Sequence, residues 1–327
     1  METVDGTAEA VPFQGNLNPN FLVHAIVLLF PMRRNRRCFR VVNMGSSPTS
    51  PPPEILPPQS QYAPPPPPRP RRRWASAPAT YLLVGINCAV YLLMVARGVS
   101  MWSPTVGQLM YFGADNAGNV LIDGQWWRIV TAMFVHVGIL HLATNMWCLW
   151  NLGLLAEPLM GSFGLFAVYI LTGAAGNLLS TCYNWVRPLH DPSGAPFFAA
   201  GAGASGAVFG IAGALIILLK SKRLPIPQYE LKRLRKSVIY FAAINLVIGL
   251  SVNFGSGFTG VEIDNSAHIG GFLCGLLFAV PMVPRIGSPR SVFQTRMRLA
   301  VTATVILLVL FGFYVAHIPP PQGIAGN

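Results

Sequence analysis

Charged residues are scarce in this chain: Asp, Glu, Lys and Arg make up only 10% of its 327 residues, and only 11 residues are acidic. Hydrophobic residues make up 52%, and the mean hydropathy is +0.49. An average soluble domain carries about 25% charged residues. The composition therefore excludes an ordinary soluble domain and favours an all-α, polytopic membrane protein.

The sequence also lacks several common site motifs. Its five cysteines are odd in number and form no CxxC pair, and four of them lie in apolar stretches, so we interpret them as core residues. HExxH is absent, and no pair of Asp residues lies within the apolar segments. These absences argue against zinc and aspartyl proteolysis in the membrane, and we expect no metal and no cofactor.

The basic residues are distributed as a membrane topology requires. The formal charge of +12 raises the question of a nucleic-acid partner, but the 23 Lys and Arg residues cluster beside apolar segments. We therefore expect the lipid bilayer, and no nucleic acid, as a partner. Residues 1–78 hold a Pro-rich run and two Arg clusters, which predict a disordered cytosolic tail that starts at Met1 or Met44.

Seven apolar segments follow this tail, and each is a candidate membrane helix. They span residues 80–96, 140–159, 163–183, 205–219, 238–254, 267–283 and 299–318. Nine basic residues precede the first segment, seven separate the fourth from the fifth, and four separate the sixth from the seventh. Only Arg97, Arg128 and Arg187 lie on the other side, which predicts a cytosolic N-terminus and an outer C-terminus.

The loop between the first two segments, residues 98–128, is long and rich in aromatic residues. Such residues favour an element that lies in the headgroup region of the bilayer, although a plain linker remains an alternative. Its apolar and aromatic side chains include Met101, Trp102, Tyr111, Phe112, Trp126 and Trp127.

Small residues precede Ser205 at the start of the fourth segment, in the run Gly201-Ala202-Gly203-Ala204-Ser205-Gly206. They allow a tight turn that presents the serine at a helix N-terminus, where free amides stabilise developing negative charge. A helix from Ser205 to Leu219 rises only about 22 Å against a hydrocarbon core of about 30 Å, which places Ser205 below the outer surface. Taken alone, GxSG favours simple close packing of helices.

The sixth segment contains His268, and a histidine in an apolar helix needs a partner. Gly271 and Gly275 lie on the same helical face, at i+3 and i+7, and the fourth segment offers a similar face through Gly206, Gly210 and Gly213. Two such faces approach closely enough for Ser205 and His268 to hydrogen-bond.

Phe209, one turn after Ser205, is placed to pack against the imidazole of His268. The nearest acids, Glu262 and Asp264, are expected in the outer loop, so the sequence favours a Ser-His dyad over a triad.

The second segment supplies His136, His141 and Asn145. His141 and Asn145 are four residues apart, so both side chains can point to one place and donate hydrogen bonds to an oxyanion. An alternative is that His136, His141 and His268 bind a metal or haem, as in a membrane oxidoreductase, but no carboxylate or cysteine completes a ligand set on these segments.

These residues resemble, in kind and in order, those of the rhomboid family of intramembrane serine proteases. The matches run from residue 79 to residue 284 and comprise Trp127-Arg128, His136, His141, Asn145, Glu157, Gly161, Gly203 to Gly206, Ala267-His268, Gly270-Gly271 and Gly275. One departure is Phe209, where a tyrosine is common in the family.

The resemblance implies a six-helix core over residues 79–284 with a water-filled site that opens outward. It also implies cleavage of single- or multi-pass membrane proteins near the outer ends of their transmembrane helices. Ser205 would be the nucleophile and His268 the base, with an oxyanion site of His141, Asn145 and the Ser205 amide. His136, Phe209, Gly203, Gly206, Gly271, Gly275, Trp127 and Arg128 would support them.

Residues 285–327 would then form a cytosolic linker, a seventh helix and a short outer tail. Two other classes remain open: a proteolytically inert rhomboid-like protein that binds membrane clients, and a transporter, which the absence of a repeated half-sequence disfavours. We expect a multi-pass protein of a cell membrane, with a bacterial inner membrane favoured over an organelle.

Overall fold

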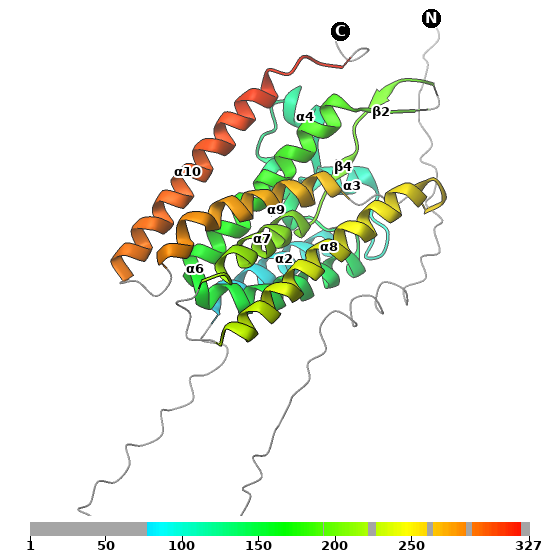
Figure 1. Ribbon diagram of the computed structural model, residues 1–327. Coiled ribbons are helices and arrows are strands. Elements are labelled where there is room, and N and C mark those ends of the chain that lie inside the picture. Colours follow the sequence, from blue (N-terminus) through cyan, green and yellow to red (C-terminus); the bar gives the residue numbers. More distant parts are fainter. Residues whose placement is uncertain (1–76, 192, 222–226, 260–263, 286–289, 322–327) are drawn as a thin grey trace, which may run out of the picture.

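The computed structural model describes residues 77–321 except for four short gaps, at 192, 222–226, 260–263 and 286–289. The expected N-terminal tail, residues 1–78, lies outside the described residues apart from its last two positions. The remainder is a bundle of helices with two very short antiparallel sheets at one end (Figure 1).

The chain enters the bundle through α2, Pro78–Ala96, whose first residue is a proline, a residue well suited to the first helical turn. The carboxylate of Glu157 caps this helix, because it accepts hydrogen bonds from Ala79 N at 2.9 Å and Thr80 N at 2.8 Å. It also accepts from Thr80 Oγ1 at 2.7 Å and Ser162 Oγ at 2.6 Å. One buried acid thus joins the start of α2 to the middle of the next long helix.

The loop after α2, which the sequence predicts to face outward, is folded into short elements rather than extended. These are α3 (Val106–Tyr111), β1 (Asp115–Asn116), α4 (Ala117–Leu121), α5 (Arg128–Thr131) and η2 (Ala132–Phe134). Trp102 and Tyr111 project from the loop with 70% and 78% of their surface exposed. Large exposed aromatics suit the headgroup region that the sequence suggested for this loop.

A single 48-residue element, α6 (Ile139–Val186), follows the loop. It is broken at Gly161, whose φ of 75° and ψ of 165° are not helical, three residues after Pro158. Its two arms correspond to the segments expected at 140–159 and 163–183.

The second half of the chain contains four more long helices and the remaining strands. In order, these elements are β2 (Leu189–His190), β3 (Pro196–Phe197), β4 (Ala200–Gly201), α7 (Ser205–Leu218), α8 (Gln228–Thr259), α9 (Asn265–Ala279), η3 (Val280–Arg285) and α10 (Arg290–Ala316). β1 pairs with β4, and β2 pairs with β3. Both α8 and α10 begin about ten residues before the apolar segments predicted for them, so much of the expected linker 285–298 is helical.

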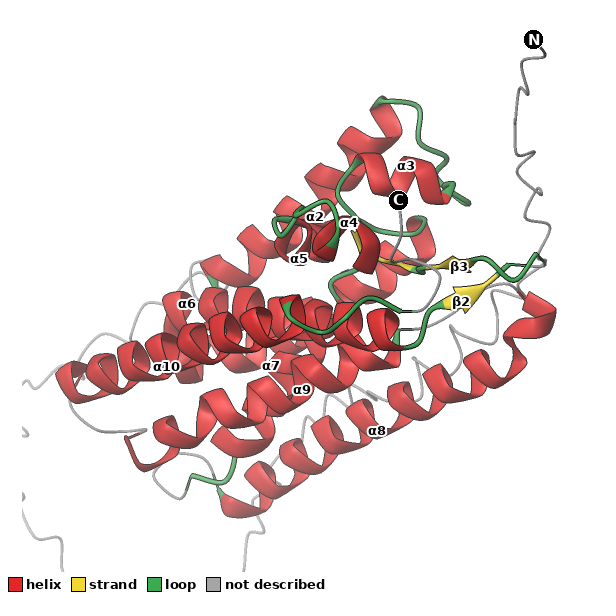
Figure 2. Cartoon of the chain, turned by 90° about the horizontal axis from the view of Figure 1, so that it is seen from above, coloured by secondary structure: helices red, strands yellow, loops and turns green. Residues whose placement is uncertain are grey.

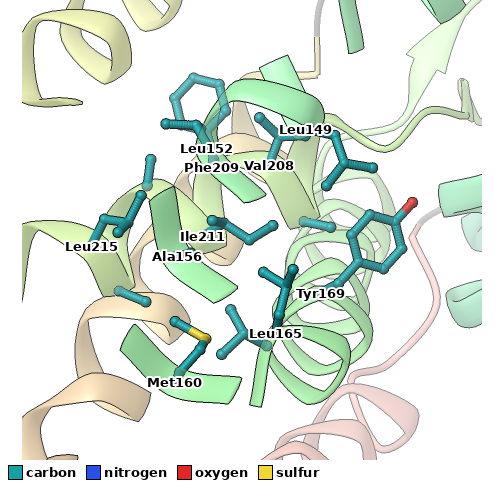
Figure 3. Packing of buried hydrophobic residues seen from close by; sticks show 14 of the residues in the cluster. Leu149, Leu152, Ala156, Met160, Leu165, Tyr169, Val208, Phe209, Ile211 and Leu215 are labelled. Atoms are coloured by element: carbon teal, nitrogen blue, oxygen red, sulfur yellow. The ribbon is translucent and has the colours of Figure 1, made fainter. Parts of the chain in front are cut away.

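α7 is the central helix of the bundle (Figure 1). Twelve of its 14 residues are buried, and it is apolar all round, as a helix enclosed by others should be. Side chains of α6 pack around it, so that Val208, Ile211 and Leu215 meet Leu149 and Leu165 in one core (Figure 3).

α8 and α10 lie on opposite edges of the bundle (Figure 1), and Figure 2 shows α8 along one edge. α8 contacts α7 and α9, whereas α10 contacts α6, α9 and η3. In the described part of the chain, four elements are long and apolar enough to cross a membrane: Pro78–Ala96, Ile139–Val186, Asn265–Met282 and Ser291–Ala316. α7 is apolar but shorter, and α8 begins with a basic stretch.

Candidate functional site

The helices α7 and α9 pack closely along facing glycines. A β-carbon on Gly271 would collide with the carbonyl oxygen of Gly206, and one on Gly275 would collide with that of Gly210. At the start of this seam, a β-carbon on Gly206 would lie 3.3 Å from the carbonyl oxygen of Ala267. Backbones this close require glycine, and they set the residue before Gly206 beside the residue after Ala267.

Those two residues are Ser205 and His268. Ser205 is the first residue of α7 and is half-buried. His268 lies in the first turn of α9 and is 6% exposed. The ring of Phe209, one turn after Ser205, stacks on the imidazole with centroids 4.3 Å apart and planes 10° from parallel. The structure therefore brings Ser205, Phe209 and His268 to one end of the α7/α9 seam.

The contacts of His268 define its surroundings. Its Nδ1 is buried and has no hydrogen-bond partner among the described residues, Ser205 included.

The loop that carries Ser205 is held from two sides. β4 pairs with β1, with Gly201 opposite Asp115, and the amide of Gly203 donates to the carbonyl of Ala132 at 2.9 Å. Gly203 has a φ of 128°, and a β-carbon there would lie 2.6 Å from His141 Cε1. Only glycine satisfies both demands, which explains why Gly203 precedes the serine.

His141 therefore lies directly against the Ser205 loop. The amide of Val137 donates to His141 Nδ1 at 3.3 Å, which makes Nδ1 the acceptor and leaves the proton on Nε2. Nε2 is also a near neighbour of Gly203, since a β-carbon there would lie 3.0 Å from it. The tautomer thus offers a donor beside Gly203, in the loop that carries Ser205.

Asn145 lies one turn after His141 on α6 and is 6% exposed. Its Nδ2 donates to the carbonyl of His141 at 2.9 Å. A side-chain amide has two N–H groups, so one donor remains for another acceptor.

His136 is fully buried, with its ring centroid 5.4 Å from that of His141. Its Nδ1 lies 3.2 Å from the carbonyl of Phe134 and must donate to it. Burial, together with the neighbouring His141, lowers the pKa of His136 to about 3, so the ring is neutral. Its Nε2 is then an acceptor, and a neutral ring in this position supports the packing of His141.

No three His, Cys, Asp or Glu side chains within the described ranges converge as a ligand set.

Trp127 and Arg128 do not join this group and instead hold together the loop between α2 and α6. Arg128 is 7% exposed and donates to the carbonyl oxygens of Met110 and Ala114, both at 2.8 Å. Its guanidinium also lies over the ring of Trp127, 4.6 Å from the centroid. These residues position the loop that contains β1.

Sequence reasoning missed one feature near the site, the pair of acids Asp115 and Asp264. Asp264 was expected in the loop before the sixth segment, and from the end of that loop it caps α9 by accepting from Ala267 N at 2.9 Å. Nothing in the sequence indicated a role for Asp115, because it is an isolated acid in a two-residue strand. The Asp-Asn-Ser run before the apolar segment is typical of a helix start, and it could have predicted the capping role of Asp264. Glu262 lies outside the described residues.

The fold and the site together define a class: a helical, multi-pass membrane protein that gathers a serine, a histidine and two further hydrogen-bonding side chains at one end of its bundle. Comparison with known proteins makes the class specific. A family model described as "Rhomboid domain" matches residues 123–285.

The chain is also similar to individual rhomboid proteins. It is 30% identical over 243 residues to Rhomboid protease GluP of Bacillus subtilis (strain 168), which covers 74% of this chain and 41% of GluP. It is 32% identical over 213 residues to Rhomboid protease AarA of Providencia stuartii, which covers 62% of this chain and 72% of AarA. RHOMBOID-like protein 7 of Arabidopsis thaliana is 32% identical over 174 residues, 53% of this chain and 48% of that protein.

The chain belongs to the rhomboid family. It matches less than half of the length of GluP and of RHOMBOID-like protein 7. The relatives named as rhomboid proteases place it in a family of membrane proteases.

Proposed function

We propose that this protein is an intramembrane serine endopeptidase that hydrolyses peptide bonds in or near the transmembrane helices of other membrane proteins. The observation that carries the proposal is the glycine seam between α7 and α9, which sets Ser205 beside His268. The relatives GluP and AarA, both named rhomboid proteases, support the same reaction.

In the proposed reaction, His268 accepts the hydroxyl proton of Ser205 while Oγ attacks the scissile carbonyl carbon. The tetrahedral intermediate collapses to an acyl-enzyme, and His268 returns the proton to the leaving amine. A water molecule then attacks the ester with His268 as base, which releases the second fragment as an acid and restores Ser205. The stack on Phe209 holds the imidazole plane during both steps.

The oxyanion would lie at the N-terminus of α7. We assign its donors to the backbone amide of Ser205, Nε2 of His141 and the free N–H of Asn145. The helix dipole of α7 adds a partial positive charge at the same end.

A dyad fits the surroundings of His268 better than a triad. Asp264 is the nearest acid on α9, but its carboxylate is occupied by Ala267 N, Ser266 Oγ and Ser180 Oγ. The imidazole is thus oriented by stacking on Phe209 rather than by a carboxylate.

The fold we propose around this chemistry is a core of six membrane helices with α10 as a seventh. The two arms of α6 count as separate spans, and α7 and α8 complete the six with α2 and α9. The N-terminus would face the cytosol and the C-terminus the outside of a bacterial inner membrane. The substrates would be single- or multi-pass membrane proteins.

Replacement of the dyad tests the proposal directly. We expect Ser205→Ala and His268→Ala each to abolish cleavage of a transmembrane reporter in proteoliposomes, while the variants insert and purify normally. Ser103→Ala is the matched control, because Ser103 is an exposed serine of the outer loop. Cleavage by Ser205→Ala at the wild-type rate would refute the assignment.

An inert rhomboid-like protein that binds membrane clients is the alternative that the RHOMBOID-like relatives leave open. A serine-directed fluorophosphonate discriminates between the two. The proposed protease reacts covalently at Ser205, and labelling is lost in Ser205→Ala. A wild-type protein that neither labels nor cleaves would be assigned to the inert class.

A further inference from the structure

Two carboxyl groups from distant parts of the sequence meet beside the Ser205 loop. Asp115 lies on β1 opposite Gly201 of β4, and Asp264 lies at the start of α9. A β-carbon on Gly201 would be 3.6 Å from both Asp115 Cβ and Asp264 Oδ2. Asp115 and Asp264, the carboxyl pair, therefore border the backbone four residues before Ser205.

Asp264 fixes the first turn of α9, which carries His268. Its Oδ1 accepts from Ala267 N at 2.9 Å and from Ser266 Oγ at 2.5 Å, and its backbone carbonyl accepts from His268 N at 3.2 Å. Its Oδ2 accepts from Ser180 Oγ of α6 at 2.5 Å. One residue thus ties the helix of the proposed base to α6.

Asp115 is held by the next residue of α6. Its side chain is 3% exposed, and Oδ2 accepts from Thr181 Oγ1 at 2.9 Å. Its Oδ1 is buried with no hydrogen-bond partner in the described part of the chain. An ionised carboxylate with an unpaired oxygen in such a place is much more costly than a protonated carboxyl.

The charged groups that face Asp115 are Asp264 on α9 and Arg128 on α5. The guanidinium of Arg128 already donates to Met110, Ala114 and Gln125, and it only partly offsets the negative charge. Burial first, and then the charge of Asp264, raise the pKa of Asp115 from its ordinary 3.8 to about 7. Asp115 therefore changes charge near neutral pH.

We propose that Asp115 and Asp264 are positioning residues that hold the Ser205 loop and the His268 helix in register while Asp115 is protonated, and that its ionisation loosens this contact. The inference rests on the proposed protease function. The physical reason is that a second negative charge beside Asp264 repels it across Gly201, where the buried Asp115 carboxylate is shielded from water. β1 and β4 are then pushed away from α9.

The test compares reporter cleavage by wild type and by Asp115→Asn from pH 5 to pH 9. Asn copies the shape of the protonated acid but cannot ionise. We expect the ratio of the Asp115→Asn rate to the wild-type rate to rise about tenfold between pH 6 and pH 8, because the protonated fraction of a group with a pKa near 7 falls by about that factor. The ratio cancels the titration of His268 itself.

Two further variants separate positioning from a merely structural role. Asp264→Asn keeps a capping side chain on α9 but removes the charge that helps to raise the pKa of Asp115, so we expect Asp115 to ionise at lower pH and any remaining loss of rate to move to lower pH with it. Adding Asp115→Asn to Asp264→Asn should abolish the loss of cleavage rate altogether.

Asp191→Asn is the control, because the pKa of this exposed loop acid is lowered by hydrogen bonds from Ser193 and Ala195, so that it stays ionised from pH 5 to pH 9. A ratio for Asp115→Asn that is flat from pH 5 to pH 9 would overturn the proposal.

Thermal unfolding in detergent gives a readout that is independent of proteolysis. Because the folded-state pKa of Asp115 is raised, its contribution to stability is complete below about pH 3.8 and is lost as the pH rises to about 7. The wild-type midpoint should fall over this window relative to Asp115→Asn. If wild type cleaves the reporter at no pH, the proposed protease function fails. The pH dependence of the unfolding midpoint then tests the role of the carboxyl pair by itself. Identical midpoint-versus-pH curves for wild type and Asp115→Asn would refute that role.

Discussion

At the scale of single residues, the role proposed for Asn145 uses one side-chain amide for both a helix and a reaction. One of its N–H groups is used by the carbonyl of His141, and the other is available to an oxyanion. The His141 ring beside it is fixed as the Nε2–H tautomer by the amide of Val137. Both donors are therefore set before a substrate arrives, which is the condition for strong electrostatic stabilisation.

Asn145→Ala should lower kcat for a transmembrane reporter by about 10²- to 10³-fold, with a smaller change in KM, since the lost bond forms mainly in the transition state. Asn151→Ala is a close control. Asn151 lies on the same helix and donates to the carbonyl four residues back, Trp147 O, at 2.7 Å, just as Asn145 does to His141. An equal loss of kcat in both variants would show that the effect comes from the helix and not from the oxyanion site.

At the scale of helices, the α7/α9 seam is the feature with the least tolerance for change. Gly271 and Gly275 leave no space for a side chain because the opposing atoms are backbone carbonyls, which cannot rotate away. Glycine pairs at this spacing allow two membrane helices to touch backbone to backbone.

Gly275→Leu should force α7 and α9 apart, reduce stability by at least about 1–3 kcal/mol and abolish cleavage. Thermal unfolding in detergent and reporter cleavage measure the two effects. Gly85→Leu is the matched control, because a β-carbon at Gly85 on α2 would meet no atom within 4 Å. Wild-type stability in Gly275→Leu would contradict this account of the seam.

The sequence predicted the helices well where hydropathy alone defines them. The segment at 205–219 corresponds to α7, and the break predicted between residues 159 and 163 lies at Gly161. The starts of α8 and α10 were placed too late, because their first turns are basic and a hydropathy pattern detects only the apolar part of a helix. Helical propensity of Lys, Arg and Gln extends both helices outside the apolar stretch.

The sequence predicted which residues form the candidate site, but it did not predict all of the contacts around them. Glycine spacing indicated which faces of α7 and α9 would meet, and the four-residue spacing of His141 and Asn145 indicated a shared direction. The pairing of β1 with β4 was not predictable, because strands of two residues have no periodicity and lie 85 positions apart, Asp115 to Ala200. The carboxyl pair depends on that pairing and was missed with it.

At the scale of the whole molecule, charge and loops divide the bundle into two ends. The basic starts of α8 and α10 lie at one end, and β2 and β4 lie at the other (Figure 1). This polarity agrees with the orientation proposed from the positive-inside rule, in which the basic end faces the cytosol.

Topology reporters test that orientation in a bacterial host. Alkaline phosphatase fused after Asn327 should be active, because the enzyme folds only outside the cytosol, whereas a fusion after Lys220 should be inactive. A green fluorescent protein fused at the same two positions should give the opposite pattern. Active phosphatase after Lys220 together with inactive phosphatase after Asn327 would invert the proposed topology.

The burial of α7 also determines how the thickness of a bilayer acts on this protein. A helix of 14 residues spans about 21 Å, which is too short for a hydrocarbon core of about 30 Å, but α7 is enclosed by protein and carries no lipid-facing mismatch. The outer helices alone adapt to the lipids by tilting, and they carry α7 with them. We therefore expect those outer helices to set the depth of the proposed nucleophile, Ser205, so that a thicker membrane would move the proposed cleavage position along a substrate helix without changing the site itself.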